Sequence, residues 1–196
     1  MKYMMDSHIL DVPHMYEEIQ RKSVEIGFTM PSDIHMGSLL KTLITAKPNA
    51  NFLELGTGIG LSLVWMIAGM DQVSKLITID NDPDLVKIAN TYFGGDKRVE
   101  IICADGTKWL KNYKGEKFDL IFADAWPGKY SEIEEVLDLV KVGGFYVIDD
   151  MNAQPNWPEG HQEHVDRLTD YLENRNDFNC TKINWSTGLI VATRRC

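Results

Sequence analysis

The sequence has few cysteines, no long hydrophobic run and fewer basic than acidic residues. Its three cysteines are an odd number and lie far apart, at Cys103, Cys180 and Cys196, which predicts free thiols in a reducing cytosol rather than a disulfide framework. The longest mainly apolar stretch, 61–70, is too short to cross a bilayer, and the first residues lack the apolar core of a secretory signal. The formal net charge of −9 would repel a phosphate backbone. We therefore expect a cytoplasmic protein with neither nucleic acid nor membrane as a partner.

The composition of the chain is that of an ordinary globular domain. Of its 196 residues, 44% are hydrophobic and 25% are charged, which argues against disorder and predicts one domain over 1–196. Residues 1–48 show helical spacing, with Pro13 suited to a first turn and Ser32 or Asp33 suited to cap a second helix. We expect these N-terminal helices to cover a site on a core that spans 51–194.

From residue 51 onward, short apolar runs alternate with segments that have helical patterns. Asp82 before Pro83 is a typical helix start, and Gly143-Gly144 is expected to end the helix that precedes the fifth run. This alternation predicts parallel strands joined by right-handed crossovers. The five apolar runs are 51–55, 75–80, 99–104, 118–124 and 144–150.

The last two apolar runs follow a different pattern. Only Ser186 and Thr187 separate 179–185 from 188–194, and a connection this short predicts an antiparallel hairpin rather than a crossover. The expected fold class is therefore α/β: a doubly wound, Rossmann-like, seven-stranded and mostly parallel sheet with a C-terminal antiparallel hairpin.

The segment 52–60, FLELGTGIG, predicts a strand that enters a glycine turn before a helix. Glycines allow a sharp turn and a close approach of the backbone to a ligand, although a glycine after a strand is also a common structural feature. The next strand ends at Asp80, roughly 20 residues further on, where an acid can accept both ribose hydroxyls of a nucleoside. Asp105 follows the third strand and would either accept the exocyclic amine of adenine or cap the next helix.

Two families of nucleoside-binding enzymes compete for this pattern. Dinucleotide-dependent dehydrogenases prefer G-x-G-x-x-G near the start of the domain, whereas Gly56, Gly58 and Gly60 give G-x-G-x-G after 50 residues. The terminal hairpin is also foreign to the dehydrogenase fold. Over 51–194 the sequence instead resembles the class I S-adenosylmethionine-dependent methyltransferases, and a nicotinamide-dependent dehydrogenase is the less favoured alternative.

The resemblance implies a set of cofactor-binding residues. Asp80 with Asn81 would bind the ribose, and Asp105 with the backbone of Gly106 would bind adenine. Met30, in the N-terminal segment, would lie near the sulfonium. The remaining residues would orient the loop or hold the methionine part: Glu54, Gly56, Thr57, Gly58, Gly60, Ser62 and Asp124.

Three carboxylates follow the fourth and fifth predicted strands. Asp124, Asp149 and Asp150 should converge on one sheet edge, where they would repel one another unless a hard cation such as Mg²⁺ lay between them. The alternative is that one or two of them are helix caps or solvated loop residues. The sequence thus predicts either a divalent metal site at these three residues or an acidic edge without metal.

This acidic edge resembles that of the small cation-dependent O-methyltransferases of the catechol and caffeoyl-coenzyme A type. Asp124 and Tyr130 match the ends of their D-x-x-K-x-x-Y segment, but Pro127 stands at the lysine position and Lys129 follows two residues later. Asp149-Asp150 stands where these enzymes have D-N. The resemblance implies that Asp124 is catalytic and that Lys129 is the catalytic base, reaching the site from its shifted position. The alternative is that a metal-bound acceptor loses its proton to water.

The sequence therefore predicts methyl transfer from S-adenosylmethionine to oxygen of a small, hydroxylated aromatic acceptor, either with or without Mg²⁺ or another divalent cation as a further cofactor. The alternative is a non-catalytic S-adenosylmethionine-binding protein, which Pro127 supports. Trp126 and Trp157 are expected either to wall the acceptor or to anchor the core. His161 and His164 do not predict zinc, because a third ligand is missing. The oligomeric state is left open, with a homodimer as one possibility.

Two surface features complete the expectations. The stretch 166–178 predicts a solvated amphipathic helix, and Glu132, Glu134 and Glu135 predict an exposed acidic surface rather than a second site.

Overall fold

The computed structural model describes residues 8–9, 11–155 and 157–196. The helical pattern expected over 1–48 includes 1–7 and 10, which lie outside the described residues. No helix in the described part of the chain is long and apolar enough to cross a bilayer.

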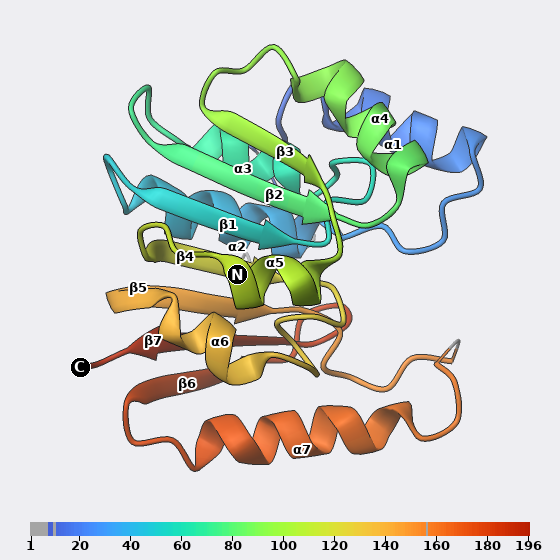
Figure 1. The fold of residues 1–196 in the computed structure, drawn as a ribbon. Coiled ribbons are helices and arrows are strands. Elements are labelled where there is room, and N and C mark those ends of the chain that lie inside the picture. The colour runs from blue at the N-terminus through green and yellow to red at the C-terminus, as the bar shows by residue number, and fades with distance from the viewer. Residues whose placement is uncertain (1–7, 10, 156) are drawn as a thin grey trace, which may run out of the picture.

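Seven strands form a single sheet (Figure 1) in the order β3-β2-β1-β4-β5-β7-β6. The first five strands are parallel, whereas β7 is antiparallel to both β5 and β6. This confirms the predicted doubly wound sheet with a C-terminal hairpin. The strands are β1 (Asn51–Leu55), β2 (Lys75–Asp80), β3 (Val99–Cys103), β4 (Phe118–Ala123), β5 (Val140–Ile148), β6 (Phe178–Ile183) and β7 (Leu189–Arg194).

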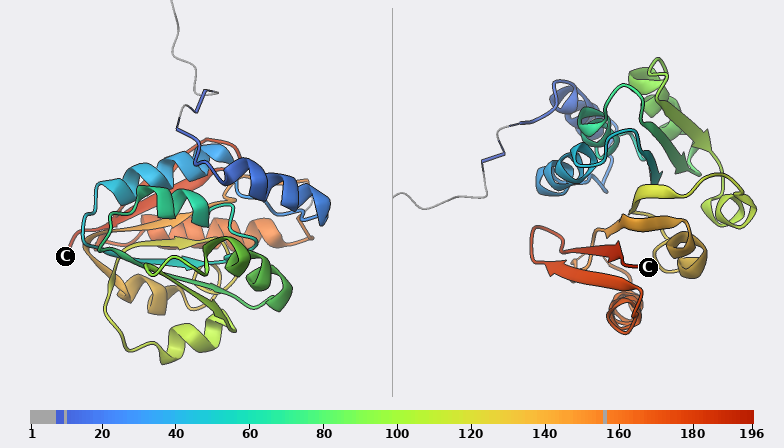
Figure 2. Two further views of the ribbon diagram at one scale, coloured as in Figure 1. Left: turned by 90° about the horizontal axis from the view of Figure 1, so that it is seen from above. Right: turned by 90° about the vertical axis from the view of Figure 1, so that its left-hand side faces the viewer.

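Helices cover both faces of this sheet (Figure 2), as parallel crossovers require. Alternate strand residues face opposite sides, so Phe52 packs into one core and Leu53 into the other. The first core lies beneath α1 (Tyr16–Glu25), α2 (Ile34–Thr45), α3 (Leu63–Gly69) and α4 (Pro83–Phe93). The second lies beneath α5 (Gly106–Asn112), α6 (Ile133–Asp138) and α7 (His161–Glu173).

The helix signals in the sequence were correct where a polar cap was present. The Asp33 side chain accepts hydrogen bonds from the backbone N–H groups of His35 and Met36 and caps α2. Asp82 caps α4 in the same way, with Pro83 as the first helical residue. These caps satisfy amide groups that have no partner inside the helix.

Two predicted boundaries were wrong. Gly143-Gly144 does not end a helix, because α6 stops at Asp138 and both glycines lie inside β5. They lie where the register of the pairing between β4 and β5 shifts, and Gly143 has a φ of +75° there. The last helix is α7, at 161–173 instead of 166–178, and Phe178 begins β6 because its ring is buried in the core.

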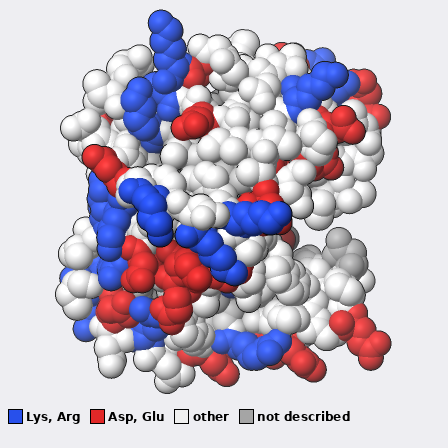
Figure 3. All heavy atoms as spheres, viewed as in Figure 1, with Lys and Arg blue, Asp and Glu red and all other residues white. Residues whose placement is uncertain are grey.

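Charges of both signs gather on the face drawn in Figure 3, with acidic side chains over α6 and basic ones over α5. Glu134 and Glu135 are exposed, as predicted. Glu132 is not, because its carboxylate accepts a hydrogen bond from the Thr107 hydroxyl at 2.8 Å and pairs with the Lys111 ammonium at 3.1 Å. It therefore joins the start of α6 to α5. The three cysteines are all free thiols.

Candidate active site

The carboxyl ends of the five parallel strands meet at one edge of the sheet, and chain connectivity reverses between β1 and β4. Open α/β sheets bind ligands at this point. A cavity of about 280 Å³ lies there. Asp80, Asp105, Trp126 and Pro127 are among the residues that line it, together with the loop residue Gly56. The predicted residues Asn81 and Gly106 also line this cleft.

The glycine loop approaches β4 closely at Gly56. This residue has a φ of +103°, and a Cβ atom would lie 2.7 Å from the carbonyl oxygen of Asp124. Only glycine fits both the dihedral angle and the space. Asp80 fixes the next part of the loop, because its Oδ2 accepts a hydrogen bond from the N–H of Gly58 at 2.8 Å.

A buried polar network lies beneath the loop. The hydroxyls of Ser62 and Thr78 each donate to a carboxylate oxygen of Glu54 at 2.5 Å. The Thr78 hydroxyl donates its single proton to Glu54. The Thr57 hydroxyl therefore donates to the hydroxyl oxygen of Thr78, at 2.5 Å. Glu54 is 0% exposed, and burial raises the pKa of Glu54 to about 7, against the lowering effect of these hydrogen bonds.

This network includes two residues of the predicted cofactor site. The side chains of Ser62 and Thr57 are buried beneath the loop, where they bond within the network and do not line the cofactor cleft. The Ser62 hydroxyl bonds to the carboxylate of Glu54, and the Thr57 hydroxyl bonds to the hydroxyl of Thr78. Glu54 itself supports the loop, in line with the orienting role that the resemblance implied.

The network makes the stability of the fold depend on pH through Glu54. Its folded-state pKa of about 7 lies above the ordinary value of 4.5, so the folded state binds this proton more tightly and stability falls as pH rises between these values. We expect the free energy of unfolding, measured in urea, to fall by about 2–3 kcal/mol more between pH 5 and pH 8 in the wild type than in Glu54→Gln. Equal pH slopes for the two proteins would contradict the assignment.

Asp105 is a helix cap that also lies at the cleft. Its Oδ1 accepts a hydrogen bond from the N–H of Lys108 at 2.9 Å and caps α5, and the residue also lines the cleft. Pro127 packs against the same end of α5, since a Cβ on Gly106 would lie 3.1 Å from its Cβ. The proline at the lysine position of the motif thus forms part of the cleft wall. Met30 lies apart from this wall and is 71% exposed.

The predicted acidic residues follow the paired strands β4 and β5. Asp149 is only 4% exposed, and its Oδ1 accepts hydrogen bonds from the Thr187 hydroxyl and from the N–H of Asp150. Burial raises the pKa of Asp149 to about 6. Burial, and then the charge of Asp149, raises the pKa of Asp124. The charge of Asp150 also raises the pKa of Asp124 and the pKa of Asp149. The backbone of Asp150 is left-handed, with a φ of +54°.

These residues do not fit a divalent cation in this arrangement. Within 8–9, 11–155 and 157–196, no three His, Cys, Asp or Glu side chains are grouped so that they could hold a metal ion. A buried lysine, Lys129, which is only 4% exposed, acts electrostatically on both Asp124 and Asp149. The cation expected from the sequence is therefore not supported by the geometry.

A cluster of aromatic and imidazole rings stands beside this acidic edge, and the sequence did not predict it as a unit. The Tyr130 hydroxyl lies 3.2 Å from Nε2 of His161. The Trp126 ring lies 4.8 Å from His164, and Trp157 lies 4.3 Å from His161, between ring centroids. His161 and His164 share a helix face, as their spacing indicated, but nothing local in the sequence shows that this face meets 126–130.

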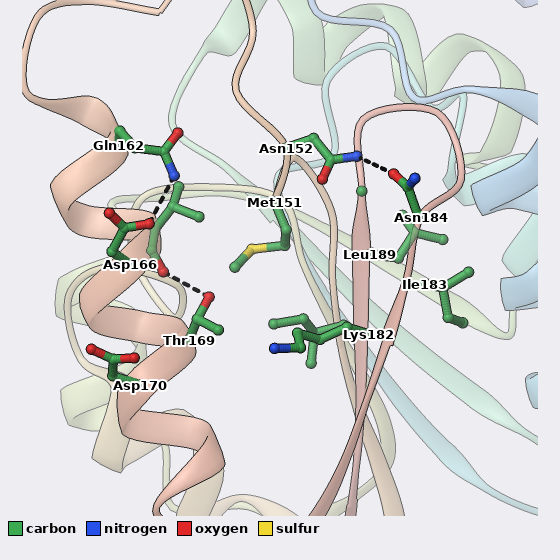
Figure 4. A pocket seen from close by; sticks show the side chains of 13 residues that line it. Met151, Asn152, Gln162, Asp166, Thr169, Asp170, Lys182, Ile183, Asn184 and Leu189 are labelled. Atoms are coloured by element: carbon green, nitrogen blue, oxygen red, sulfur yellow. Dashed lines mark hydrogen bonds between the residues drawn. The ribbon is translucent and has the colours of Figure 1, made fainter.

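A second, larger cavity of about 570 Å³ lies between α7 and the β6–β7 hairpin (Figure 4). Many of its polar groups are already paired: Gln162 bonds to Asp166, and Asn152 bonds to Asn184. None of the predicted site residues lines it. We therefore place the candidate site at the smaller cleft, which is lined by the glycine loop and by both acids that the sequence predicts to bind a nucleoside.

Comparison with known sequences points to one family. The sequence profile of the O-methyltransferase family matches residues 7–176. A provisionally assigned O-methyltransferase of Mycobacterium avium is 30% identical over 134 residues, which cover 66% of this chain and 60% of that protein. The chain thus spans about 60% of the length of this relative.

Solved structures share the fold. An O-methyltransferase of Bacillus cereus, solved with S-adenosylhomocysteine, has a TM-score of 0.81 and 20% identity, covering 96% of this chain and 94% of its own. TomG of Streptomyces achromogenes, an O-methyltransferase of tomaymycin synthesis solved with S-adenosylmethionine, has a TM-score of 0.82 and 22% identity, covering 97% and 93%.

Proposed function

Because the chain belongs to the family of class I S-adenosylmethionine-dependent O-methyltransferases, we propose that it methylates a hydroxyl oxygen of a small aromatic acceptor. The observation that carries this proposal is the cleft at the carboxyl ends of β1 to β4. Its glycine loop permits close backbone approach, and the carboxylates of Asp80 and Asp105 line the cleft. The free thiols support the reducing cytosol as the site of action.

The residues of the cleft fit S-adenosylmethionine. Asp80 would accept the ribose hydroxyls, while Asn81 lies beside it on the cleft wall. Asp105 and the backbone of Gly106 would hold adenine, with Pro127 against its plane. Gly56 would leave room for the methionine part, and Met30 would approach the sulfonium from the N-terminal segment. When bound, the cofactor supplies a methyl carbon already activated by positively charged sulfur.

The acceptor would lie beside the acidic edge. The rings of Trp126 and Trp157 would flank an aromatic acceptor, and Asp124 and Lys129 would face its reacting hydroxyl. Transfer forms a bond from the acceptor oxygen to the methyl carbon as the methyl–sulfur bond breaks, and the hydroxyl proton passes to solvent water. These residues mainly need to align the oxygen with the methyl group and to exclude water.

The test is a methyl-transfer screen over hydroxylated aromatics, with and without Mg²⁺, scored by release of S-adenosylhomocysteine. We expect turnover on at least one catechol-like compound and none on matched compounds whose hydroxyls are already methylated. Cofactor binding without turnover on any acceptor would instead support a non-catalytic binding protein.

A further inference from the structure

A buried cation stands at the acidic edge, where the sequence favoured a divalent metal. Lys129 is 4% exposed, and its ammonium lies 5.1 Å from the centroid of the Tyr130 ring. Lysine is almost never buried unless opposite charge compensates it. The carboxylates of Asp124 and Asp149, which follow β4 and β5, act on this ammonium electrostatically.

The turn that carries Lys129 is fixed in the core. The carbonyl oxygen of Trp126 accepts hydrogen bonds from the N–H groups of Tyr130 and Ser131, at 2.9 and 3.2 Å. The Tyr146 hydroxyl donates to the carbonyl oxygen of Gly128 at 2.5 Å. A Cβ on Gly128 would lie 2.3 Å from Cδ1 of Leu55. This packing holds Lys129 inward, although it stands two residues beyond the usual lysine position.

One ammonium acts on groups from three elements. Its charge lowers the pKa of Asp124, after β4, and of Asp149, after β5, against the raising effect of burial. It also lowers the pKa of His161 on α7, where burial is the larger cause. Further titratable groups act at this edge: Asp150, Tyr130, Glu54 and His164. A divalent cation placed among these groups would be repelled by the ammonium.

We propose that the Lys129 ammonium takes the place of a divalent cation at the acceptor site, so that this chain works without Mg²⁺. The part that concerns turnover rests on the proposed function, whereas the part that concerns metal binding does not. During transfer, the ammonium compensates the negative charge that develops on the acceptor oxygen as its proton leaves. The same charge keeps metal ions away from Asp124 and Asp149.

The decisive experiment measures Mn²⁺ binding to the purified full chain by electron paramagnetic resonance. We expect no binding to the wild type or to Lys129→Arg at about 1 mM Mn²⁺, because both carry the cation. Lys129→Gln removes the charge at similar volume and should bind Mn²⁺ at least about tenfold more tightly. Lys87→Gln, on the exposed side of α4, controls for net charge and should behave as the wild type.

Two results would overturn the proposal. One is Mn²⁺ binding to the wild type with a Kd below about 0.1 mM that Asp149→Asn abolishes. The other is a folded Lys129→Gln protein with no gain in Mn²⁺ affinity. If Lys129→Gln does not fold, the wild-type titration decides alone.

Activity gives a second readout that separates this proposal from the proposed function. On an acceptor identified by the screen, we expect the wild type to keep its full rate after exhaustive chelation. Loss of that rate, restored by Mg²⁺, would refute the role of Lys129 and leave the methyltransferase assignment intact. Absence of transfer under all conditions would refute the assignment and leave the Mn²⁺ result unaffected.

Discussion

Asp80→Ala should weaken S-adenosylmethionine binding by about 10- to 150-fold, because a hydrogen bond to a charged acceptor contributes roughly 1.5–3 kcal/mol. The Asp80 carboxylate already accepts the N–H of Gly58 at 2.8 Å and that of Asp82 at 3.0 Å. These bonds orient the carboxylate at the cleft wall and leave further lone pairs for ribose hydroxyls. Isothermal titration calorimetry with each protein measures the change.

The matched control is Asp84→Ala, which removes the same charge from an exposed position in the first turn of α4. We expect its affinity to stay within about twofold of the wild type, since exposed charges at this range are screened by salt. Asp80→Asn should fall between the two, because the amide keeps an acceptor oxygen without the charge. An unchanged affinity in a folded Asp80→Ala protein would refute the ribose assignment.

Gly56→Ala should damage both the fold and the cofactor site. At a φ of +103° an alanine is strained, and its Cβ would lie 2.7 Å from the carbonyl oxygen of Asp124, which is backbone and cannot rotate away. Strain and overpacking together predict a loss of about 2–5 kcal/mol in the free energy of unfolding. The displaced loop should also reduce S-adenosylmethionine affinity by more than about tenfold. Urea denaturation and calorimetry measure the two effects.

Gly95→Ala provides the comparison for this substitution. Gly95 has no positive φ, and its added Cβ would meet nothing within 4 Å. The free energy of unfolding of the Gly95→Ala protein should therefore differ from that of the wild type by no more than about 0.5 kcal/mol. Equal stabilities for Gly56→Ala and Gly95→Ala would show that the glycine loop does not need its close contact with β4.

Most of the fold could be predicted because its signals are local. The strands β1 and β2 have the predicted bounds 51–55 and 75–80, since apolar runs in a buried parallel sheet are continuous. The short connection 186–187 was enough to predict the terminal hairpin. The start of β5 could not be predicted. Gly143 lies at a register shift within the strand, and the local sequence pattern does not distinguish such a glycine from one that ends a helix.

The cofactor side of the site was more predictable than the acceptor side. Asp80 ends β2 and Asp105 comes shortly after β3, so their place at the carboxyl edge follows from the topology alone. The inward position of Lys129 depends instead on a turn fixed by Gly128, at a φ of +83°. The contact between Tyr130 and His161 joins segments 31 residues apart in the sequence. Contacts of this kind depend on how loops pack, which single-residue patterns do not encode.

The most direct test of the methyltransferase account uses S-adenosylmethionine labelled with a CD₃ group and the best acceptor of the screen. Mass spectrometry and NMR of the product identify the atom that receives the label. The account predicts an O–CD₃ ether on a former aromatic hydroxyl, with one S-adenosylhomocysteine formed per ether. Label on nitrogen or carbon, or S-adenosylhomocysteine formed without a methylated acceptor, would contradict it.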